Sequence, residues 1–262
     1  LADDFVALMN REDAPMLNRT TQAVYPLGTL INIPALAAYW TDPQVRYQYP
    51  KLSPRLDYPC YQAIQAADNH VNVLQYGCES ASADLMQGAT PQDLAEMMRA
   101  LGLFRVPAVA VESAQAAADP ALAGDETAWL QEAQQTSVTP LQMALMAAVL
   151  SNDGQQPSPK LVNSYKSGNG AWVAFGGNTS AVEVFNPDLA LQLRNQFLAD
   201  SQPIWYLNAH APLESGETLT WYLGGTTPQW VGVPLAIAVA IEGNNPKLSQ
   251  EIGSQLLNLL TP

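Results

Sequence analysis

Basic residues are scarce in this chain of 262 residues, which holds 11 Lys and Arg against 24 Asp and Glu, for a formal net charge of −13. Proteins that bind nucleic acid need clustered Lys and Arg to neutralise the phosphates. The sequence has no such cluster, so we expect no nucleic-acid partner. Charged residues of either sign make up only 13% of the chain and hydrophobic residues 48%, a balance that predicts a folded protein.

Cysteine and histidine are also rare, with two of each. Most structural zinc sites need four such ligands at close spacing. The sequence also lacks a Gly-rich phosphate loop, a dinucleotide fingerprint, Gly-x-Ser-x-Gly and His-Glu-x-x-His. We therefore expect neither a metal nor a cofactor, and we interpret His70 and His210 as ordinary polar residues. Composition alone leaves open whether Cys60 and Cys78 are two buried thiols or form a disulfide.

Long apolar runs are missing as well. The longest, residues 233–241, includes Pro234 and is too short to cross a bilayer. The chain begins at Leu1, and no charged and apolar leader follows. We expect that a targeting segment has been removed, or that the sequence is a piece of a longer protein.

Four segments begin with a capping residue followed by proline, a pattern typical of helix N-termini because proline has no amide hydrogen to leave unpaired there. These starts are Thr90-Pro91, Thr139-Pro140, Asn186-Pro187 and Asn245-Pro246. Apolar spacing predicts that the first helix ends at Gly102 and that the second, apolar nearly all round, ends at 152–154. In the last two helices we expect apolar sides formed by Leu189, Leu193 and Phe197, and by Leu248, Ile252, Leu256 and Leu259.

Strand patterns lie between the last two predicted helices. Residues 204–207, 218–223 and 234–241 are rich in aliphatic, aromatic or β-branched side chains and are separated by Gly and Pro. They predict an antiparallel meander on which the last helix folds back. A further isolated strand is expected at 171–175, whereas the proline-rich first 59 residues predict loops. Helices followed by an antiparallel sheet indicate an α+β fold, and without repeats or linkers we expect one domain over 1–262.

Sequence motifs along nearly the whole chain resemble a known family. Residues 15–28, Pro-Met-Leu-Asn-Arg-Thr-Thr-Gln-Ala-Val-Tyr-Pro-Leu-Gly, are similar to the P-L-L-N-R-A-x-Q-G-x-Y-P-P-G segment of penicillin-binding protein transpeptidase domains. Residues 138–144 resemble the family's V-T-P-L-Q-L-A. Residues 152–154 and 159–162 resemble its N-G-G and P-K-L-V, and residues 221–224, 234–239 and 242 resemble its last two strands. The resemblance implies an antiparallel sheet with a mainly helical subdomain, in a chain that lacks the family's first core strands.

The resemblance breaks down at the positions that carry the family's chemistry. In the family, a serine and a lysine three residues later share one helix face, so that the amine can take the hydroxyl proton. Here Thr29 and Asn32 stand at those positions. Gly77 and Glu79 stand at the outer positions of the Ser-x-Asn motif. The Lys-Thr-Gly motif corresponds to Leu207, Asn208 and Ala209, by a looser alignment.

These replacements imply a pseudoenzyme of peptidoglycan metabolism that serves as a scaffold or binds a ligand in the old cleft. The alternative is an active acyl-transfer enzyme of the D,D-transpeptidase or carboxypeptidase type, with Thr29 as nucleophile activated by Glu79 or His210. The resemblance further implies an extracytoplasmic location and a membrane anchor upstream of this segment. A peptidoglycan peptide or cell-wall synthesis proteins are the implied partners. Because the family often has a cysteine at the position of Cys78, the resemblance favours a disulfide with Cys60.

Overall fold

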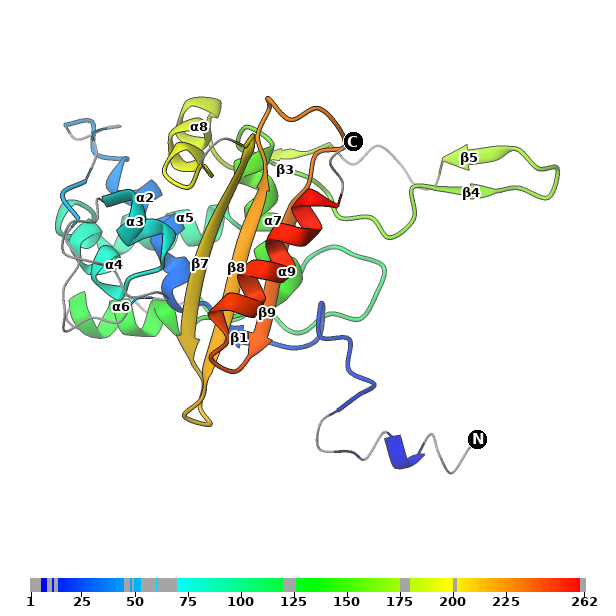
Figure 1. The fold of residues 1–262 in the computed structure, drawn as a ribbon, viewed down its shortest axis with the longest axis horizontal. Coiled ribbons are helices and arrows are strands. Elements are labelled where there is room, and N and C mark those ends of the chain that lie inside the picture. The colour runs from blue at the N-terminus through cyan, green and yellow to red at the C-terminus, as the bar shows by residue number, and fades with distance from the viewer. Residues whose placement is uncertain are drawn as a thin grey trace.

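A three-stranded antiparallel sheet forms one half of the molecule (Figure 1). The computed structural model describes residues 6–8, 11, 14–44, 48, 50–52, 60, 70–119, 126–174, 180–199 and 202–259. Strands β7 (Ile204–Pro212), β8 (Thr218–Thr226) and β9 (Ala236–Glu242) follow one another in the order β7-β8-β9, with Trp221 of β8 opposite Ala209 and Ala240. The predicted meander is confirmed, with β7 five residues longer at its end than the 204–207 segment.

Alternate residues of the sheet contact helices on opposite sides. Ala238 of β9 packs against the main core, to which helix α7 (Pro140–Ser151) contributes Met146, whereas Val239 packs with Leu257 of helix α9 (Pro246–Asn258). Because successive side chains of a strand point to opposite faces, α7 and α9 cover the two faces of the sheet. The α+β prediction, including the last helix folding back on the meander, is confirmed.

All four predicted helix starts are confirmed, at α5 (Pro91–Ala100), α7, α8 (Pro187–Asn195) and α9. Thr90 and Thr139 form reciprocal capping boxes, in which each hydroxyl accepts from the backbone three residues later and that residue's side chain accepts from the cap. Asn186 accepts from the backbone N–H of Leu189 at 2.9 Å. Proline leaves no amide hydrogen unpaired at any of these starts.

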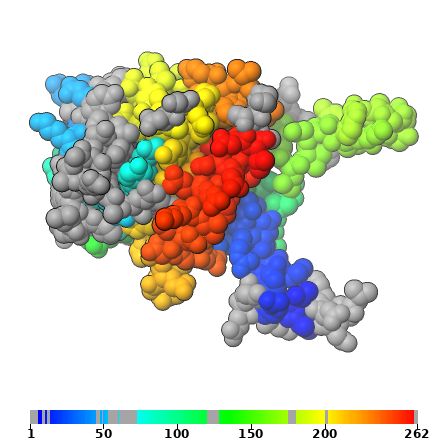
Figure 2. Space-filling view, viewed as in Figure 1, coloured from blue at the N-terminus to red at the C-terminus, as the bar shows by residue number. Residues whose placement is uncertain are grey.

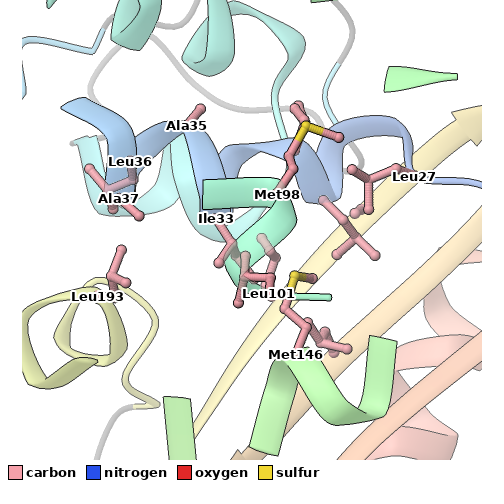
Figure 3. Close-up of a cluster of buried hydrophobic side chains, with 14 of the residues drawn as sticks. Leu27, Ile33, Ala35, Leu36, Ala37, Met98, Leu101, Met146 and Leu193 are labelled. Atoms are coloured by element: carbon pink, nitrogen blue, oxygen red, sulfur yellow. The ribbon is translucent and has the colours of Figure 1, made fainter. Parts of the chain in front are cut away.

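A buried helix near the N-terminus overturns part of the loop prediction for the first 59 residues. The short helix η1 (Gly28–Ile31) leads into α2 (Asn32–Tyr39), and every side chain from 32 to 38 is buried. Figure 3 shows Ile33 and Leu36 of α2 among Met98, Met146 and Leu193 from three other elements. The helix is apolar on all sides because neighbours surround it, so it lacks the amphipathic period that a sequence pattern detects. Within the same stretch, residues 45–47 and 53–59 lie outside the described residues.

The remaining elements connect the sheet to the helical half. Three helices were not predicted: α3 (His70–Gln75), α4 (Glu79–Leu85) and α6 (Glu126–Gln134), and the short η2 (Met86–Gly88) follows α4. Strand β1 (Tyr25–Pro26) pairs with β2 (Ser137–Val138), and β3 (Gln155–Gln156) pairs with β6 (Val182–Glu183). The strand predicted as isolated at 171–175 is β5 (Trp172–Ala174), which pairs with β4 (Ser164–Lys166) in a hairpin. The side chain of His70 lies outside the described residues.

The buried side of α9 differs from the prediction. Of the four predicted residues, Leu248, Leu256 and Leu259 are 40%, 41% and 75% exposed and Ile252 is half-buried, whereas Ser249, Gly253 and Leu257 are buried. The reason is the ring of Tyr222, which lies so close to Gly253 that a Cβ there would come within 2.2 Å of it. The helix therefore approaches the sheet through its smallest residue rather than through its leucines.

A disulfide joins Cys60 to Cys78 across a sequence separation of 18 residues. Cys78 is fully buried and is the N-cap residue of α4. The cross-link therefore fixes the chain immediately before Glu79, one of the residues aligned with the family's second motif.

We expect Gly253→Ala to lower the free energy of unfolding by about 1–3 kcal/mol, because the added methyl group meets the Tyr222 ring. This direction opposes helix propensity, which favours Ala by about 1 kcal/mol. Urea denaturation measures the change. The matched control is Gly168→Ala, since a Cβ there meets nothing within 4 Å and should leave the stability unchanged to within about 0.5 kcal/mol. An unchanged or raised midpoint for Gly253→Ala would contradict the close packing.

We expect Cys60→Ala to lower the stability of oxidised protein by about 3 kcal/mol, because a loop of this length no longer restricts the unfolded chain. After reduction, the wild type and the variant should unfold at similar denaturant concentrations. Thiol titration of non-reduced protein, produced in an oxidising compartment, should detect no free thiol. Two free thiols per chain would show that the pairing is wrong.

Candidate functional site

The segment before Thr29 is anchored to the sheet by Tyr25. The Tyr25 hydroxyl donates a hydrogen bond to Glu242 Oε1 at 2.7 Å, and the ring meets Trp221 edge-on, with centroids 5.9 Å apart. Burial, with the bond to the Glu242 carboxylate as a second cause, raises the pKa of Tyr25 to about 12. Two residues further on, the Leu27 N–H donates to the Thr136 carbonyl at 2.9 Å. Thr29 is thus held in a fixed position at the start of η1.

The Thr29 hydroxyl lies against the backbone of β7 and is shielded from solvent. Thr29 is 2% exposed, and its Oγ1 accepts the His210 backbone N–H at 3.0 Å. The same hydroxyl lies 3.4 Å from the His210 carbonyl oxygen, to which it donates. Neither backbone group can take up the hydroxyl proton at ordinary pH, so these contacts hold the hydroxyl without activating it.

Asn32 lies one helical turn after Thr29 and is completely buried. Its Nδ2 donates to the Cys78 carbonyl at 3.3 Å, a contact that ties α2 to the start of α4. Its Oδ1 has no hydrogen-bond partner among the described residues. An amide is not a base, so this residue secures the packing of the helical half and offers nothing to the Thr29 hydroxyl.

Gly77 allows β7 to approach the helical half very closely. Its φ is +55°, and a Cβ built on it would lie 2.4 Å from the Asn208 carbonyl oxygen and 2.8 Å from Thr29 Oγ1. A serine side chain, which the family has at this position, does not fit here unless the strand moves. The space that would separate the helices from the strand is therefore filled by backbone.

Glu79 and His210 pair with each other across the boundary between α4 and β7. Glu79 Oε1 lies 3.1 Å from His210 Nε2, and the two side chains are 32% and 13% exposed. With the carboxylate as acceptor, Nε2–H is the donor. His210 Nδ1 is buried and has no partner among the described residues. The sequence suggested either side chain as an activator of Thr29, but the structure shows contact between the hydroxyl and only the backbone of His210.

Leu207, Asn208 and Ala209 are all completely buried within β7. Leu207 and Ala209 belong to the main hydrophobic core, so an apolar, buried side chain stands at the position that the resemblance aligns with the family's lysine. Neither polar side-chain atom of Asn208 has a partner in the described part of the chain. The structure thus brings Thr29, Gly77 and the backbone of β7 together, but it turns Leu207 towards the core.

The close packing of β7 on Thr29 is the feature that sequence reasoning missed. The glycine at 77 is its one sequence indication, because a residue without Cβ permits a close backbone approach. Hollows of about 170, 490 and 390 Å³ lie elsewhere, beside Gln142, Asp93 and Ala148 respectively, and none is lined by Thr29, Gly77 or Glu79.

Within the described ranges, no three His, Cys, Asp or Glu side chains are grouped as metal ligands. None of the helices described there has both the length and the apolar character needed to span a bilayer.

Comparison with solved structures identifies relatives of the fold. Penicillin-binding protein A from Mycobacterium tuberculosis, solved as an imipenem acyl-enzyme complex, matches with a TM-score of 0.77 and 21% identity, over 98% of this chain and 64% of its own length. A crystal structure of PBPA from the same organism matches with a TM-score of 0.79 and 19% identity, over 100% of this chain and 68% of its own length. The D,D-transpeptidase domain of a peptidoglycan glycosyltransferase from Eggerthella lenta matches with a TM-score of 0.71 and 15% identity, over 98% of this chain and 71% of its own length.

The chain therefore spans 64% of the length of the first of these structures. No curated protein matches it significantly. The family model described as "Penicillin binding protein transpeptidase domain" matches residues 4–197. That match covers most of the chain and agrees with the order of the sequence motifs and with the fold. The chain belongs to the penicillin-binding protein transpeptidase domain family.

Proposed function

We propose that this domain forms no acyl-enzyme and acts in peptidoglycan metabolism as a scaffold or ligand-binding module. Its membership of the penicillin-binding protein transpeptidase domain family relates the domain to peptidoglycan synthesis. The observation that carries the proposal is the state of the Thr29 hydroxyl, which is buried and bonded to the backbone of His210. A nucleophile needs both a route to its substrate and a group that removes its proton. Thr29 has neither in this geometry.

The loss of the base weighs most heavily. A hydroxyl becomes a competent nucleophile at neutral pH only beside a group that accepts its proton, and nucleophile and base act as one unit. Asn32 stands at the position of the family's lysine, and its amide donates a hydrogen bond to the Cys78 carbonyl. Removing one member of such a unit lowers the rate by several orders of magnitude, and the loss of a second member adds little, so the replacement of the lysine alone supports the proposal.

Substrate binding would also be weakened. The family's third motif supplies a cation for the substrate carboxylate, whereas Leu207 at that position is apolar and buried. Glu79 places a negative charge at the same boundary. Two like charges about 4 Å apart repel by about 1 kcal/mol in water and by more where the site is partly buried. An acidic ligand would therefore meet repulsion where the family provides attraction.

The alternative is acyl transfer by Thr29 with Glu79 or His210 as base. It requires the Glu79–His210 pair, whose Oε1 and Nε2 are 3.1 Å apart, to separate so that one of the two side chains reaches a hydroxyl now held by the His210 backbone. It also requires β7 to withdraw from Gly77. This alternative therefore needs an open state that differs from the observed packing in both respects.

The proposal includes a place outside the cytoplasm, with a peptidoglycan peptide or cell-wall synthesis proteins as partners. The disulfide between Cys60 and Cys78 supports this location, because such bonds persist in oxidising compartments and are rare in the cytosol. The family's relation to peptidoglycan synthesis supports these partners.

We expect no covalent label when the protein is incubated with a fluorescent penicillin and resolved by denaturing electrophoresis. The β-lactam carbonyl requires an activated hydroxyl, and Thr29 is both buried and unactivated. An active penicillin-binding protein labelled in parallel verifies the reagent. A band that disappears in Thr29→Ala would contradict the proposal and support the alternative. A band that persists in Thr29→Ala would also contradict it, by revealing another nucleophile.

Restoring the first motif alone should not restore labelling. In the double variant Thr29→Ser, Asn32→Lys, β7 still covers residue 29 and Leu207 still lacks a charge. The lysine would stand at a completely buried position, so we expect a loss of stability of about 3 kcal/mol or more. Labelling and thermal unfolding are measured together, with Thr29→Ser as the control that keeps the hydroxyl and adds no charge. Rapid labelling of the double variant would mean that the site is open in solution.

A further inference from the structure

The β4–β5 hairpin projects from the body of the molecule. Residues 160–174, here called the basic arm, extend away from the sheet and the helices (Figure 1), and Figure 2 shows them as a separate lobe. Every residue of the arm is exposed except Ser167, which is half-buried. A two-stranded hairpin with little packing is only marginally stable in water. Its retention as a protruding ribbon therefore calls for a role that uses its surface.

The charge of the arm is opposite to that of the rest of the chain. Residues 157–182 hold two lysines, Lys160 and Lys166, and no Asp or Glu, whereas the other nine basic residues and all 24 acidic residues lie outside this segment. A strongly acidic body repels an anionic ligand over most of its surface. The arm, with two lysines and no acidic residue, can attract such a ligand.

The arm combines this charge with an exposed aromatic ring. Trp172 is 72% exposed and lies directly opposite Lys166 in the antiparallel register. Residues opposite each other in such a pair have their side chains on the same face. The other face carries Tyr165 and Val173, which are 48% and 38% exposed. Each face of the ribbon thus presents an aromatic side chain, and the face with Trp172 also carries Lys166.

The turn between the strands holds this arrangement in place. The Ser167 hydroxyl donates to the Ala171 carbonyl at 2.8 Å, and the Ser167 backbone N–H donates to the same oxygen at 2.9 Å. Gly170 adopts a φ of +83°, which a glycine accommodates without strain. These contacts close the turn that places the backbone of Lys166 opposite that of Trp172.

We infer that the basic arm is a binding site for a carboxylate-bearing glycan. The flat ring of Trp172 offers a face on which the apolar side of a sugar ring can stack, and Lys166 can pair with a neighbouring carboxylate. Peptidoglycan carries both groups, and its choice as the ligand rests on the proposed function. The site lies outside the region of Thr29 and needs no open cleft. Many repeats on one insoluble polymer strengthen a contact that is weak for a single sugar unit.

Two other occupants fit the arm less well. Membrane surfaces rich in anionic lipid are typically recognised by clusters of about four to eight Lys or Arg, and the arm has Lys160 and Lys166 alone. Arm-to-arm association of two copies would bring like charges together. An extended glycan matches both the narrow ribbon and its pairing of a ring with an ammonium group.

The test is co-sedimentation of the full chain with purified insoluble peptidoglycan sacculi, at low and at high salt. We expect the wild type to sediment and to be released by salt. Trp172→Ala and Lys166→Glu should each reduce the bound fraction at least fivefold. The matched controls are Val231→Ala, at a valine that is 81% exposed, and Lys247→Glu, at an exposed lysine of α9, and both should stay within twofold of the wild type. Circular dichroism verifies the fold of each variant.

Failure to sediment, or equal binding by the arm variants and the controls, would overturn the inference. Two further measurements test the other occupants. One is co-sedimentation with vesicles of phosphatidylglycerol and phosphatidylcholine, and the other is sedimentation velocity of the protein alone. Binding to vesicles without binding to sacculi, or self-association abolished by Trp172→Ala without binding to sacculi, would overturn it in favour of those occupants. The penicillin label reports on the proposed function separately, because the arm variants leave Thr29 and its surroundings unchanged.

Discussion

The closeness of the β7 backbone to Gly28 and Gly77 is the constraint on which the candidate site depends. A Cβ on Gly28 would lie 2.1 Å from the His210 carbonyl, and a Cβ on Gly77 would lie 2.4 Å from the Asn208 carbonyl. Both glycines adopt positive φ, at +57° and +55°. The sheet and the helical half therefore meet through backbone at two points on either side of Thr29. Any side chain at either glycine would push the two halves apart.

This contact explains why the buried polar atoms of the site lack partners. Asn32 Oδ1, His210 Nδ1 and both side-chain polar atoms of Asn208 are enclosed without a hydrogen bond in the described part of the chain. Leaving such a group unpaired costs about 1–3 kcal/mol. The contact persists because Leu207 and Ala209 on the same strand are buried in the main core. Apolar packing of the strand therefore outweighs the cost of leaving these polar groups unpaired.

Local signals in the sequence predicted the fold well, and tertiary fit decided the rest. Thr90 and Thr139 were recognisable as caps because a capping box is complete within four residues. The orientation of α9 was not predictable, since the exposed leucines form a regular stripe and the buried face is set by the contact of Gly253 with the Tyr222 ring. Helix α2 was missed for a related reason. Its neighbours on all sides remove the period by which an amphipathic helix is recognised.

The same distinction applies to the site. Resemblance to a family identified Thr29, Asn32 and Gly77 because each lies in or beside a short motif, and the chemical consequence of each replacement follows from the residue type. The pairing of Glu79 with His210 joins positions 131 residues apart, and neither residue alone indicates it. Once formed, that pair and the backbone contact at Gly77 have the same effect: they fasten β7 to the helical half beside the threonine hydroxyl. Under the function we propose, no catalytic base has to stay beside this hydroxyl, so the requirement for an open and hydrated cleft is relaxed and close packing of the two halves becomes the more stable arrangement.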